Sequence, residues 1–177
     1  RGGNALATTY KFLEPGNVSI HDDRWLTYPW GVNGGHPGAR STKTLVRKNG
    51  DTEILPSKCD RVQVHEGDTL YHVTWGGGGW GDPFTRPAER VAFDVEAGLL
   101  TRNGAKDNYG VVVKPDYSVS KAATTKLRAK MSKARGKTKL FDKGFENIAE
   151  LKKRCKEESG LDAPSDTIFQ TWVKAAS

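Results

Sequence analysis

Four consecutive glycines, residues 76–79, lie between Trp75 and Trp80, and the stretch ends at Gly81-Asp82-Pro83. Glycine loses more backbone entropy on folding than any other residue, so an ordered cluster indicates chain that bends sharply or approaches another group closely. Two flanking tryptophans are too large and apolar for a disordered spacer. The stretch therefore predicts a strand that continues into a rigid, aromatic-lined loop, which could hold a ligand or contact a partner subunit.

The residues before the glycine run favour an antiparallel sheet. Polar and apolar side chains alternate over residues 60–65, and turn residues separate several short runs of β-forming residues. The pair Asn49-Gly50 is the strongest short signal for a hairpin. Strands are predicted over residues 6–13, 17–20, 42–47, 52–55, 60–65 and 69–75, joined as a meander of hairpins.

After Pro83 the periodicity becomes helical. Pro87 suits a first helical turn, Gly98 suits a stop, and Val91 and Val95 share one face. Helices are predicted over residues 86–97, 103–107, 119–134 and 143–158, an extended segment over 109–113, and an apolar segment over 168–173. The expected fold class is α+β and mainly β. It comprises an antiparallel β-meander domain with short helices over residues 1–114 and a basic helical extension over residues 115–177.

Positive charge is concentrated near the end of the chain. Residues 1–114 carry 14 Lys and Arg against 13 Asp and Glu, whereas residues 115–177 carry 14 against 8. Residues 121–139 hold eight basic residues and no acid. Such a helix could neutralise phosphates, but the stretch lacks the interleaved aromatic residues of a single-strand binder. A solvated face, or a patch that docks onto an acidic partner, is the preferred interpretation.

The two cysteines, Cys59 and Cys155, lie in different contexts and belong to no CxxC pair. We therefore expect neither a disulfide framework nor a zinc knuckle, and we predict a cytoplasmic protein. No run of ~18 apolar residues occurs, so a membrane span is not expected. The chain begins at Arg1, within what resembles a loop, and we expect a processed protein or a portion of a longer one.

The loop over residues 21–40 is long and dense in glycine, proline and aromatic residues. Loops of this length inside a compact domain are usually functional. It opens on His21-Asp22-Asp23-Arg24, a set that could form an acid–base or metal site. In a strand, His21 and Asp23 would share one face and Asp22 would face the other way. An Asp–Arg pair that fixes a turn is the simpler alternative.

The glycine run also satisfies the spacing of a nucleotide-binding loop through Gly76, Gly78 and Gly81. That pattern binds a dinucleotide only where a helix begins immediately, because the helix N-terminus holds the pyrophosphate. Here Asp82-Pro83 intervenes and the surroundings are those of a β-meander. A structural turn is therefore the preferred interpretation, and no nucleophile with its base can be assembled from the sequence.

A set of short motifs occurs in the order and spacing expected of one family. They are Pro29-Trp30-Gly31, Gly34-Gly35-x-Pro37-Gly38, Leu55-Pro56-Ser57-Lys58, Gly67-Asp68, residues 76–83, residues 86–91, Gly98-Leu99 and residues 109–112. Over residues 1–113 the chain resembles the C-terminal end of the hydantoinase B/oxoprolinase family. Residues beyond Lys114 match less well and look like an added tail.

The resemblance implies a multi-subunit ATP-dependent enzyme. Members hydrolyse cyclic amides such as hydantoins, 5-oxoproline and lactams, or carboxylate ketones, and ATP is thought to phosphorylate the substrate oxygen. An A-type subunit of actin-like fold would bind ATP with Mg²⁺. A zinc or manganese ion and most catalytic groups would lie in the remainder of the B-type subunit, and no metal is predicted in this chain.

We therefore expect a C-terminal portion or small subunit of such an enzyme, inactive alone, whose catalytic residues stay unknown. Its partners would be the A-type subunit, the remainder of the B-type subunit and a cyclic amide or ketone. The predicted substrate or interface loops contain Asp22, Asp23, Arg24, Trp30, Gly34, Gly35, Gly76, Gly77, Gly78, Gly79 and Asp82. The alternative is a non-catalytic assembly or nucleic-acid-binding protein that uses the basic helix of residues 121–139.

Overall fold

The structure, a computed structural model, describes residues 1–164, so the apolar segment predicted over residues 168–173 lies outside the described residues. The chain contains antiparallel sheets and short helices, which confirms the predicted α+β class. Two compact units interleave along the described residues: residues 1–6, 28–40 and 74–144 form one, and residues 7–27, 41–73 and 145–164 form the other. We call them the loop-and-helix unit and the sheet unit. The boundary predicted at residue 114 stays a prediction.

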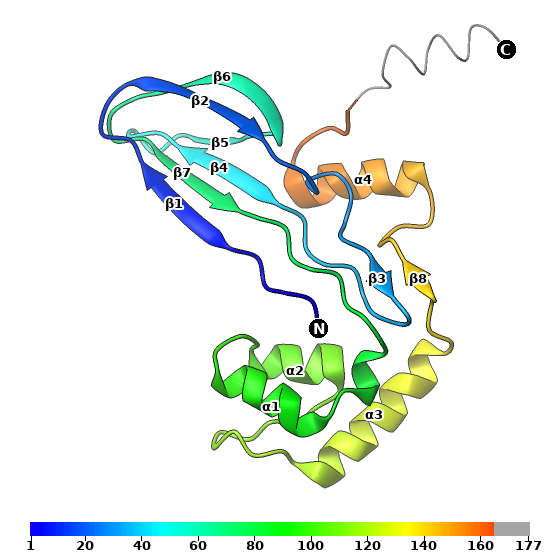
Figure 1. Cartoon of the computed structure of the whole chain (residues 1–177). Helices are drawn as coiled ribbons and strands as arrows, with labels where there is room; N and C mark the ends of the chain where they lie inside the picture. The colour runs from blue at the N-terminus through cyan, green and yellow to red at the C-terminus, as the bar shows by residue number, and fades with distance from the viewer. Residues whose placement is uncertain (165–177) are drawn as a thin grey trace, which may run out of the picture. The chain divides into compact units, whose positions relative to one another are not determined.

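Strands dominate the sheet unit (Figure 1). Its strands are β1 (Ala7–Lys11), β2 (Gly16–His21), β4 (Thr42–Val46), β5 (Thr52–Ile54), β6 (Lys58–Val64) and β7 (Thr69–Val73). β4 and β5 form the hairpin that Asn49-Gly50 predicts, with Gly50 at a positive φ of 92°. The four-stranded sheet has the order β1-β7-β4-β5, and β2 pairs separately with β6.

This order is not that of a meander, because consecutive strands β6 and β7 pair with different partners. β7 lies between β1 and β4, with Leu70 opposite Leu45 in the register. Leu45, Leu70, Val64, Ile20 and Leu55 form the buried core of the unit. The alternation over residues 60–65 correctly places Val62 and Val64 on the inner side of β6, whereas strand order depends on contacts between distant segments.

Helix α4 (Ile148–Ser159) also belongs to the sheet unit. It begins five residues later than predicted because the side chain of Asn147 accepts a hydrogen bond from Glu150 N at 2.9 Å and caps the helix. Leu151 and Cys155 of this helix are buried, whereas Ile148 is exposed. None of the helices in residues 1–164 has the length and the apolar run that a membrane span requires.

The loop-and-helix unit combines glycine-rich loops with short elements. These are β3 (Gly31–Val32), the 3₁₀ helix η1 (Pro83–Thr85), α1 (Ala88–Glu96), α2 (Arg102–Tyr109), α3 (Lys121–Arg135) and β8 (Phe141–Asp142). Val91 and Val95 of α1 pack with Ala105, Val111 and Val113 in its core. The segment predicted over residues 109–113 is buried without a regular strand, because Tyr109 still belongs to α2 and Val113 makes only an isolated bridge to Val119.

The basic helix α3 is attached to this unit by polar contacts. Thr124 Oγ1 accepts a hydrogen bond from Val112 N at 3.0 Å. The Arg128 guanidinium donates to the carbonyls of Arg86 at 2.7 Å and Tyr109 at 3.0 Å. The lysines of α3 remain on the outside, so one face of the helix fixes it to its unit while the other is highly charged.

Candidate functional site

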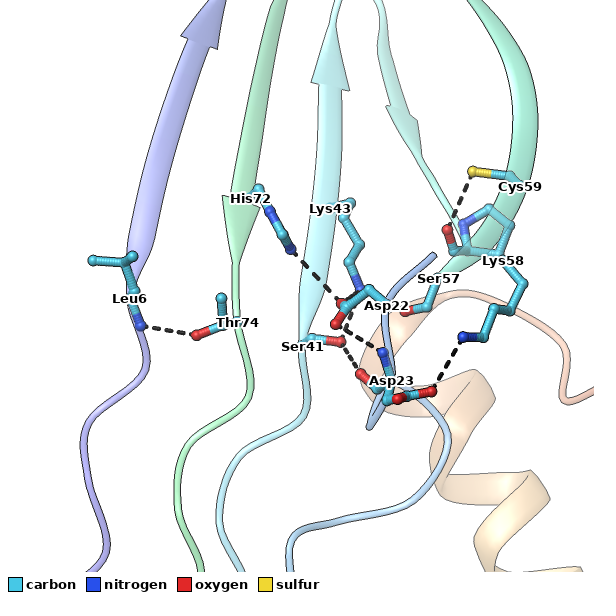
Figure 2. Close-up of polar contacts among 11 residues, drawn as sticks. Leu6, Asp22, Asp23, Ser41, Lys43, Ser57, Lys58, Cys59, His72 and Thr74 are labelled. Carbon is cyan, nitrogen blue, oxygen red and sulfur yellow. Dashed lines mark hydrogen bonds and ion pairs between the residues drawn. The ribbon is translucent and has the colours of Figure 1, made fainter. Parts of the chain in front are cut away.

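A buried charged cluster forms around Asp22 where β2 ends (Figure 2). Lys43 and His72 lie opposite each other on β4 and β7 and occupy the same inward-facing row as Leu45 and Leu70. The inward face is thus apolar at one end and polar at the other. Asp22 closes the polar end, and its own amide donates to Ser57 O at 2.8 Å.

Lys43 is the centre of this cluster and is only 1% exposed. Its ammonium group contacts three oxygens: the Asp22 carboxylate, Ser41 Oγ at 2.8 Å and Ser57 Oγ. An ammonium group has three protons, so every donor of Lys43 has a partner. A buried charge of this kind is tolerated because it is both paired and hydrogen-bonded.

Two opposing influences set the acidity of Asp22. Burial, the largest, raises the pKa of Asp22. Hydrogen bonds from Lys43, Ser41 and the Asp23 amide, with the positive charge of Lys43, outweigh burial and hold the pKa below its ordinary value. His72 Nε2 lies 3.7 Å from the carboxylate, which is beyond hydrogen-bond distance. Asp22 is therefore a stable carboxylate that balances the charge of Lys43.

The combination of serine hydroxyls and a lysine amine also occurs in nucleophilic catalysis, but the geometry here does not support that chemistry. A lysine accepts a proton from serine only as a neutral amine, whereas Lys43 faces a carboxylate and has all its donors engaged. Ser57 is fully buried, so a substrate cannot reach it. The cluster instead fixes the start of the loop over residues 21–40.

Asp23 and Arg24 follow this anchor and differ from it in exposure. The Asp23 side chain is 73% exposed and contacts Lys58 Nζ at 3.1 Å, while its carbonyl accepts a hydrogen bond from Ser41 Oγ. Arg24 adopts a left-handed φ of 58°, and its carbonyl accepts a hydrogen bond from Ser41 N. His21 pairs with Asp60 at 3.0 Å, so His21 and Asp23 do not converge, and the partner of Asp22 is a lysine and not an arginine.

The glycine run, in the loop-and-helix unit, packs directly against other glycine-rich backbone. A Cβ placed on Gly78 would lie 1.7 Å from Trp30 O, and one placed on Gly35 would lie 2.1 Å from Gly79 O. Real Cβ atoms do not come this close to other atoms, so only glycine fits at these positions. The close approach predicted from the sequence is therefore present, and the group approached is the protein's own backbone.

The amides of this run are engaged in the same packing. Gly76, Gly77, Gly79 and Gly81 donate to the carbonyls of Ala39, Gly3, His36 and Val32, at 2.8 to 3.1 Å. A phosphate cradle needs free backbone amides that point at the anion. After Gly81 the chain also enters a 3₁₀ helix before α1 begins. The glycine run therefore does not fit a nucleotide site.

An open pocket of about 720 Å³ lies beside the packed glycine loops, within the same unit. Among the residues that line it are Gly35, His36, Gly77, Trp80, Arg86 and Leu100. The Arg86 guanidinium is held by Asp94 at 2.9 Å, so it contributes a fixed positive charge to a mainly apolar wall. The volume lies within the range of small-molecule sites. Across residues 1–164 no group of three or more His, Cys, Asp or Glu side chains is placed to hold a metal ion.

Asp82 ends the glycine run and connects it to α3. Its carboxylate accepts a hydrogen bond from Phe84 N at 2.9 Å, which caps the 3₁₀ helix. Both carboxylate oxygens also contact the Arg135 guanidinium, each at 2.7 Å. These hydrogen bonds, that from Arg135 first, hold the pKa of Asp82 below its ordinary value against the opposing effect of burial. Asp82, which lines the pocket, thus fixes the start of η1 and holds the end of α3 through Arg135.

The predicted loop residues separate into two groups. Gly35, Gly76, Gly77, Gly79 and Asp82 line the pocket, whereas Asp22, Asp23 and Arg24 lie in the sheet unit. Gly34 has a positive φ of 91°, and Trp30 lies immediately before β3 and is exposed. The roles of Lys43 and Arg135 were not predicted from the sequence. Only Lys43 could have been identified, because it lies two residues from Leu45 on β4 and therefore on the same inward-facing side of the strand.

The comparisons with known proteins agree with the motifs. Residues 1–83 match the family model described as Hydantoinase B/oxoprolinase. A Pseudomonas sp. (strain NS671) protein classed as the B-type chain of a D-/L-hydantoinase is 32% identical over 130 residues, which cover 72% of this chain and 22% of that protein. The acetone carboxylase alpha subunit of Xanthobacter autotrophicus is 27% identical over 168 residues, covering 75% of this chain and 21% of that subunit.

A solved structure is also similar. The crystal structure of the ATP-dependent caprolactamase from Pseudomonas jessenii superimposes with a TM-score of 0.57 and 25% identity, over 71% of this chain and 22% of that one. The chain thus spans about a fifth of the length of the relatives it matches. From the family match and these relatives, residues 1–83 of this chain belong to the hydantoinase B/oxoprolinase family.

Proposed function

We propose that this chain is a C-terminal portion or small subunit of a multi-subunit ATP-dependent enzyme that hydrolyses a cyclic amide or carboxylates a ketone. ATP and Mg²⁺ bind to an A-type partner subunit, and the remainder of the B-type fold supplies the catalytic groups. The chain contributes a scaffold and the loops that shape the active-site wall or the subunit interface.

The observation that carries this proposal is the glycine-rich packing of residues 76–79 within the segment that matches the family. The similarity to the caprolactamase structure covers 71% of the chain, so it includes more than the matched residues 1–83. Because this chain spans only about a fifth of that protein, activity is expected of the assembly and not of the chain alone.

The contacts support an individual role for each part of the loops. Asp22 acts as a positioning residue that holds the start of the loop through Lys43. Asp23 and Arg24, which come directly after this anchor, are proposed as polar groups near the substrate or the interface. Trp30, Gly34 and Gly35 shape the neighbouring loop, while the glycine run and Asp82 shape the pocket wall.

The direct test is native mass spectrometry of the chain purified gently from its source, followed by ATP hydrolysis assays. We expect it to associate with larger subunits, and we expect the complex to cleave ATP when offered caprolactam, hydantoin or 5-oxoproline, or acetone with bicarbonate. The substrate that stimulates cleavage distinguishes the two reaction classes. A chain that migrates alone, with no ATP cleavage in any associated fraction, would contradict the proposal.

The loop roles are tested by Asp23→Ala and Arg24→Ala within the assembled complex. Turnover of each should fall about tenfold or more if these groups orient substrate, the range typical of a lost positioning contact. Asp51→Ala, at the exposed hairpin tip, is the matched control and should retain normal turnover. If Asp23→Ala and Arg24→Ala complexes assembled and turned over at the wild-type rate, the assignment of this loop would be wrong.

A further inference from the structure

The loop-and-helix unit displays large apolar side chains around the short pair β3–β8. Trp30 and Phe141 contact each other with ring centroids 5.4 Å apart, and Val32 lies opposite Phe141 in the strand register. Trp80 forms a bridge to Val32 from the neighbouring loop. We call Trp30, Val32, Trp80, Leu140 and Phe141 the aromatic patch, and their exposure ranges from 37% for Val32 to 75% for Trp80 and Leu140.

The backbone beneath this patch is well fixed. Asn33 N donates to Leu140 O at 2.7 Å, and Gly34 N donates to Lys139 O at 2.8 Å, so the pairing of β3 with β8 extends into the adjoining turn. Val32 N donates to Gly79 O, which joins the pair to the packed glycine loops. Single exposed apolar residues are common, but an exposed group on rigid backbone marks an interaction surface.

Positive charge borders the patch. The chain runs from α3 directly into β8 (Figure 1), so Lys133, Lys137 and Lys139 precede Leu140 and Phe141. Lys133 and Lys137 are exposed and form no ion pair with any residue of the described part of the chain. Residues 121–139 contain eight basic residues and no acidic residue. The neighbouring carboxylates of Asp82 and Asp142 are only 24% and 20% exposed. The surface is therefore apolar at its centre, and the lysines make its border mainly cationic.

We propose that the aromatic patch docks onto a protein surface that offers an apolar pocket rimmed by carboxylates, supplied by the part of the hydantoinase B/oxoprolinase fold that this chain does not contain. This inference rests on the proposed function. Aromatic residues at the centre of a rigid surface are typical hot spots, and complementary charges at the rim steer association. The relatives are about five times longer than the matched segment, so their folds contain ample surface to cover the patch.

Two other occupants fit less well. A second copy would bring two cationic rims together, and like charges across an interface oppose association. A nucleic-acid strand requires ring faces on which successive bases stack. Trp30 and Phe141 instead cover part of each other at an interplanar angle of 55°. The aliphatic Val32 and Leu140 add apolar surface that a protein partner buries and a phosphate backbone does not.

The experiment uses the full-length tagged chain, expressed in its source cells, with copurifying polypeptides identified by sequence and quantified by native mass spectrometry. The patch variant is Trp80→Ser combined with Phe141→Ser, and the rim variant is Lys133→Glu combined with Lys137→Glu. Phe93→Ser is the aromatic control because the exposure of Phe93, 59%, lies between those of Phe141 and Trp80, and Phe93 belongs to α1. Lys106→Glu on α2 is the charge control.

We expect the wild-type chain to retain a chain of the hydantoinase B/oxoprolinase family. The patch variant should retain at least about tenfold less of it, in keeping with loss of a hot spot. The rim variant should bind more slowly and lose its sensitivity to salt. Both controls should stay within about twofold of wild type, and far-ultraviolet circular dichroism should be unchanged in all variants because the altered side chains are exposed.

The remaining outcomes overturn the docking surface in distinguishable ways. If the patch and rim variants assemble into a family complex and support turnover as well as wild type, the docking proposal is wrong but the proposed function is unaffected. Retention of no family chain by the wild type, with no ATP cleavage, removes both. Retention of RNA or DNA, of a second copy, or of a protein from another family in place of a family chain also removes the docking surface.

Discussion

The two compact units use opposite means to fix their loops. In the sheet unit, side chains do so: a buried ammonium group, a carboxylate and two hydroxyl groups hold the end of β2. In the loop-and-helix unit, the absence of side chains does so: glycine backbones approach so closely that Gly78 has no room for a single carbon atom. Both arrangements bring together segments that are distant in the sequence.

This difference determines how each unit tolerates change. A buried ion pair depends on both partners at once, so removal of one leaves an uncompensated charge. Close backbone packing leaves no free volume, so even the smallest added group is damaging. The two units should therefore respond to different kinds of substitution, and the experiments below are ordered from the largest expected effect to the smallest.

Gly78→Ala should be the most damaging substitution. The added Cβ would lie 1.7 Å from Trp30 O, and neither backbone segment can move without breaking the neighbouring hydrogen bonds. We expect a loss of more than about 4 kcal/mol in the free energy of unfolding, or failure to fold. Thermal unfolding followed by circular dichroism measures it. Gly76→Ala is the matched control, because its Cβ would lie at an ordinary 3.4 Å from Ala39 N.

Lys43→Met should cost about 3–5 kcal/mol of unfolding free energy, because Asp22 would remain buried without its counter-charge. The double variant with Asp22→Asn should recover part of this loss. Lys58→Met is the control: its pair with Asp23 is 59% and 73% exposed, so we expect a change of at most about 1 kcal/mol. Equal effects at Lys43 and Lys58, measured by urea unfolding, would show that burial of the cluster is unimportant.

Acid should weaken the sheet unit through Asp22. Because its pKa is lower in the folded state than in the unfolded chain, its stabilising contribution is complete above the unfolded pKa of about 3.9. That contribution disappears as the pH falls through the folded pKa. Unfolding free energies measured from pH 6 downwards should decline less steeply in Asp22→Asn than in wild type. Asp23→Asn, on the exposed neighbour, serves as the control, and identical slopes for all three proteins would contradict this account.

Arg135→Met should have the smallest effect of this set. The bidentate pair with Asp82 is about a quarter exposed, so we expect a loss of about 1–2 kcal/mol, close to the upper range of surface pairs. The guanidinium also lies 4.4 Å from the Phe84 ring centroid, and methionine preserves part of that packing. Hydrogen exchange should show faster opening of η1 and the end of α3. Arg90→Met on α1 is the control. If hydrogen exchange at η1 were unchanged in Arg135→Met, the pair between Arg135 and Asp82 would not stabilise η1.

Local features of the fold were predictable from the sequence because local rules determine them. Asn49-Gly50 gave the β4–β5 hairpin, and the i,i+4 spacing of Val91 with Val95 gave the buried face of α1. Strand order was not predictable, since β7 selects β1 and β4 through side-chain contacts between distant segments. Helical periodicity alone places the start of α4 too early, because the Asn147 cap determines where that helix begins.

The candidate sites were predictable only in part. The glycine run predicted close backbone packing. The sequence did not predict which segments pack against it, namely residues 2–3, 30 and 35–39. The sequence indicated that Asp22 is a polar residue of a loop. It did not indicate that Lys43 is buried, because lysine is rarely buried. Charge pairing across strands depends on the register, and register follows from the whole sheet.

Because the side chain of Lys43 is buried and hydrogen-bonded, its reaction with a labelling reagent can measure how often the sheet unit opens. Acylating reagents attack accessible amines, and Lys43 is 1% exposed while its three contacts persist. Lys58 is more than half exposed and should react at once. The rate at which Lys43 is labelled, measured by mass spectrometry, would therefore give the rate of the rare openings of the sheet unit. A partner that stabilises the closed form of this unit would lower the labelling rate of Lys43 and leave that of Lys58 unchanged.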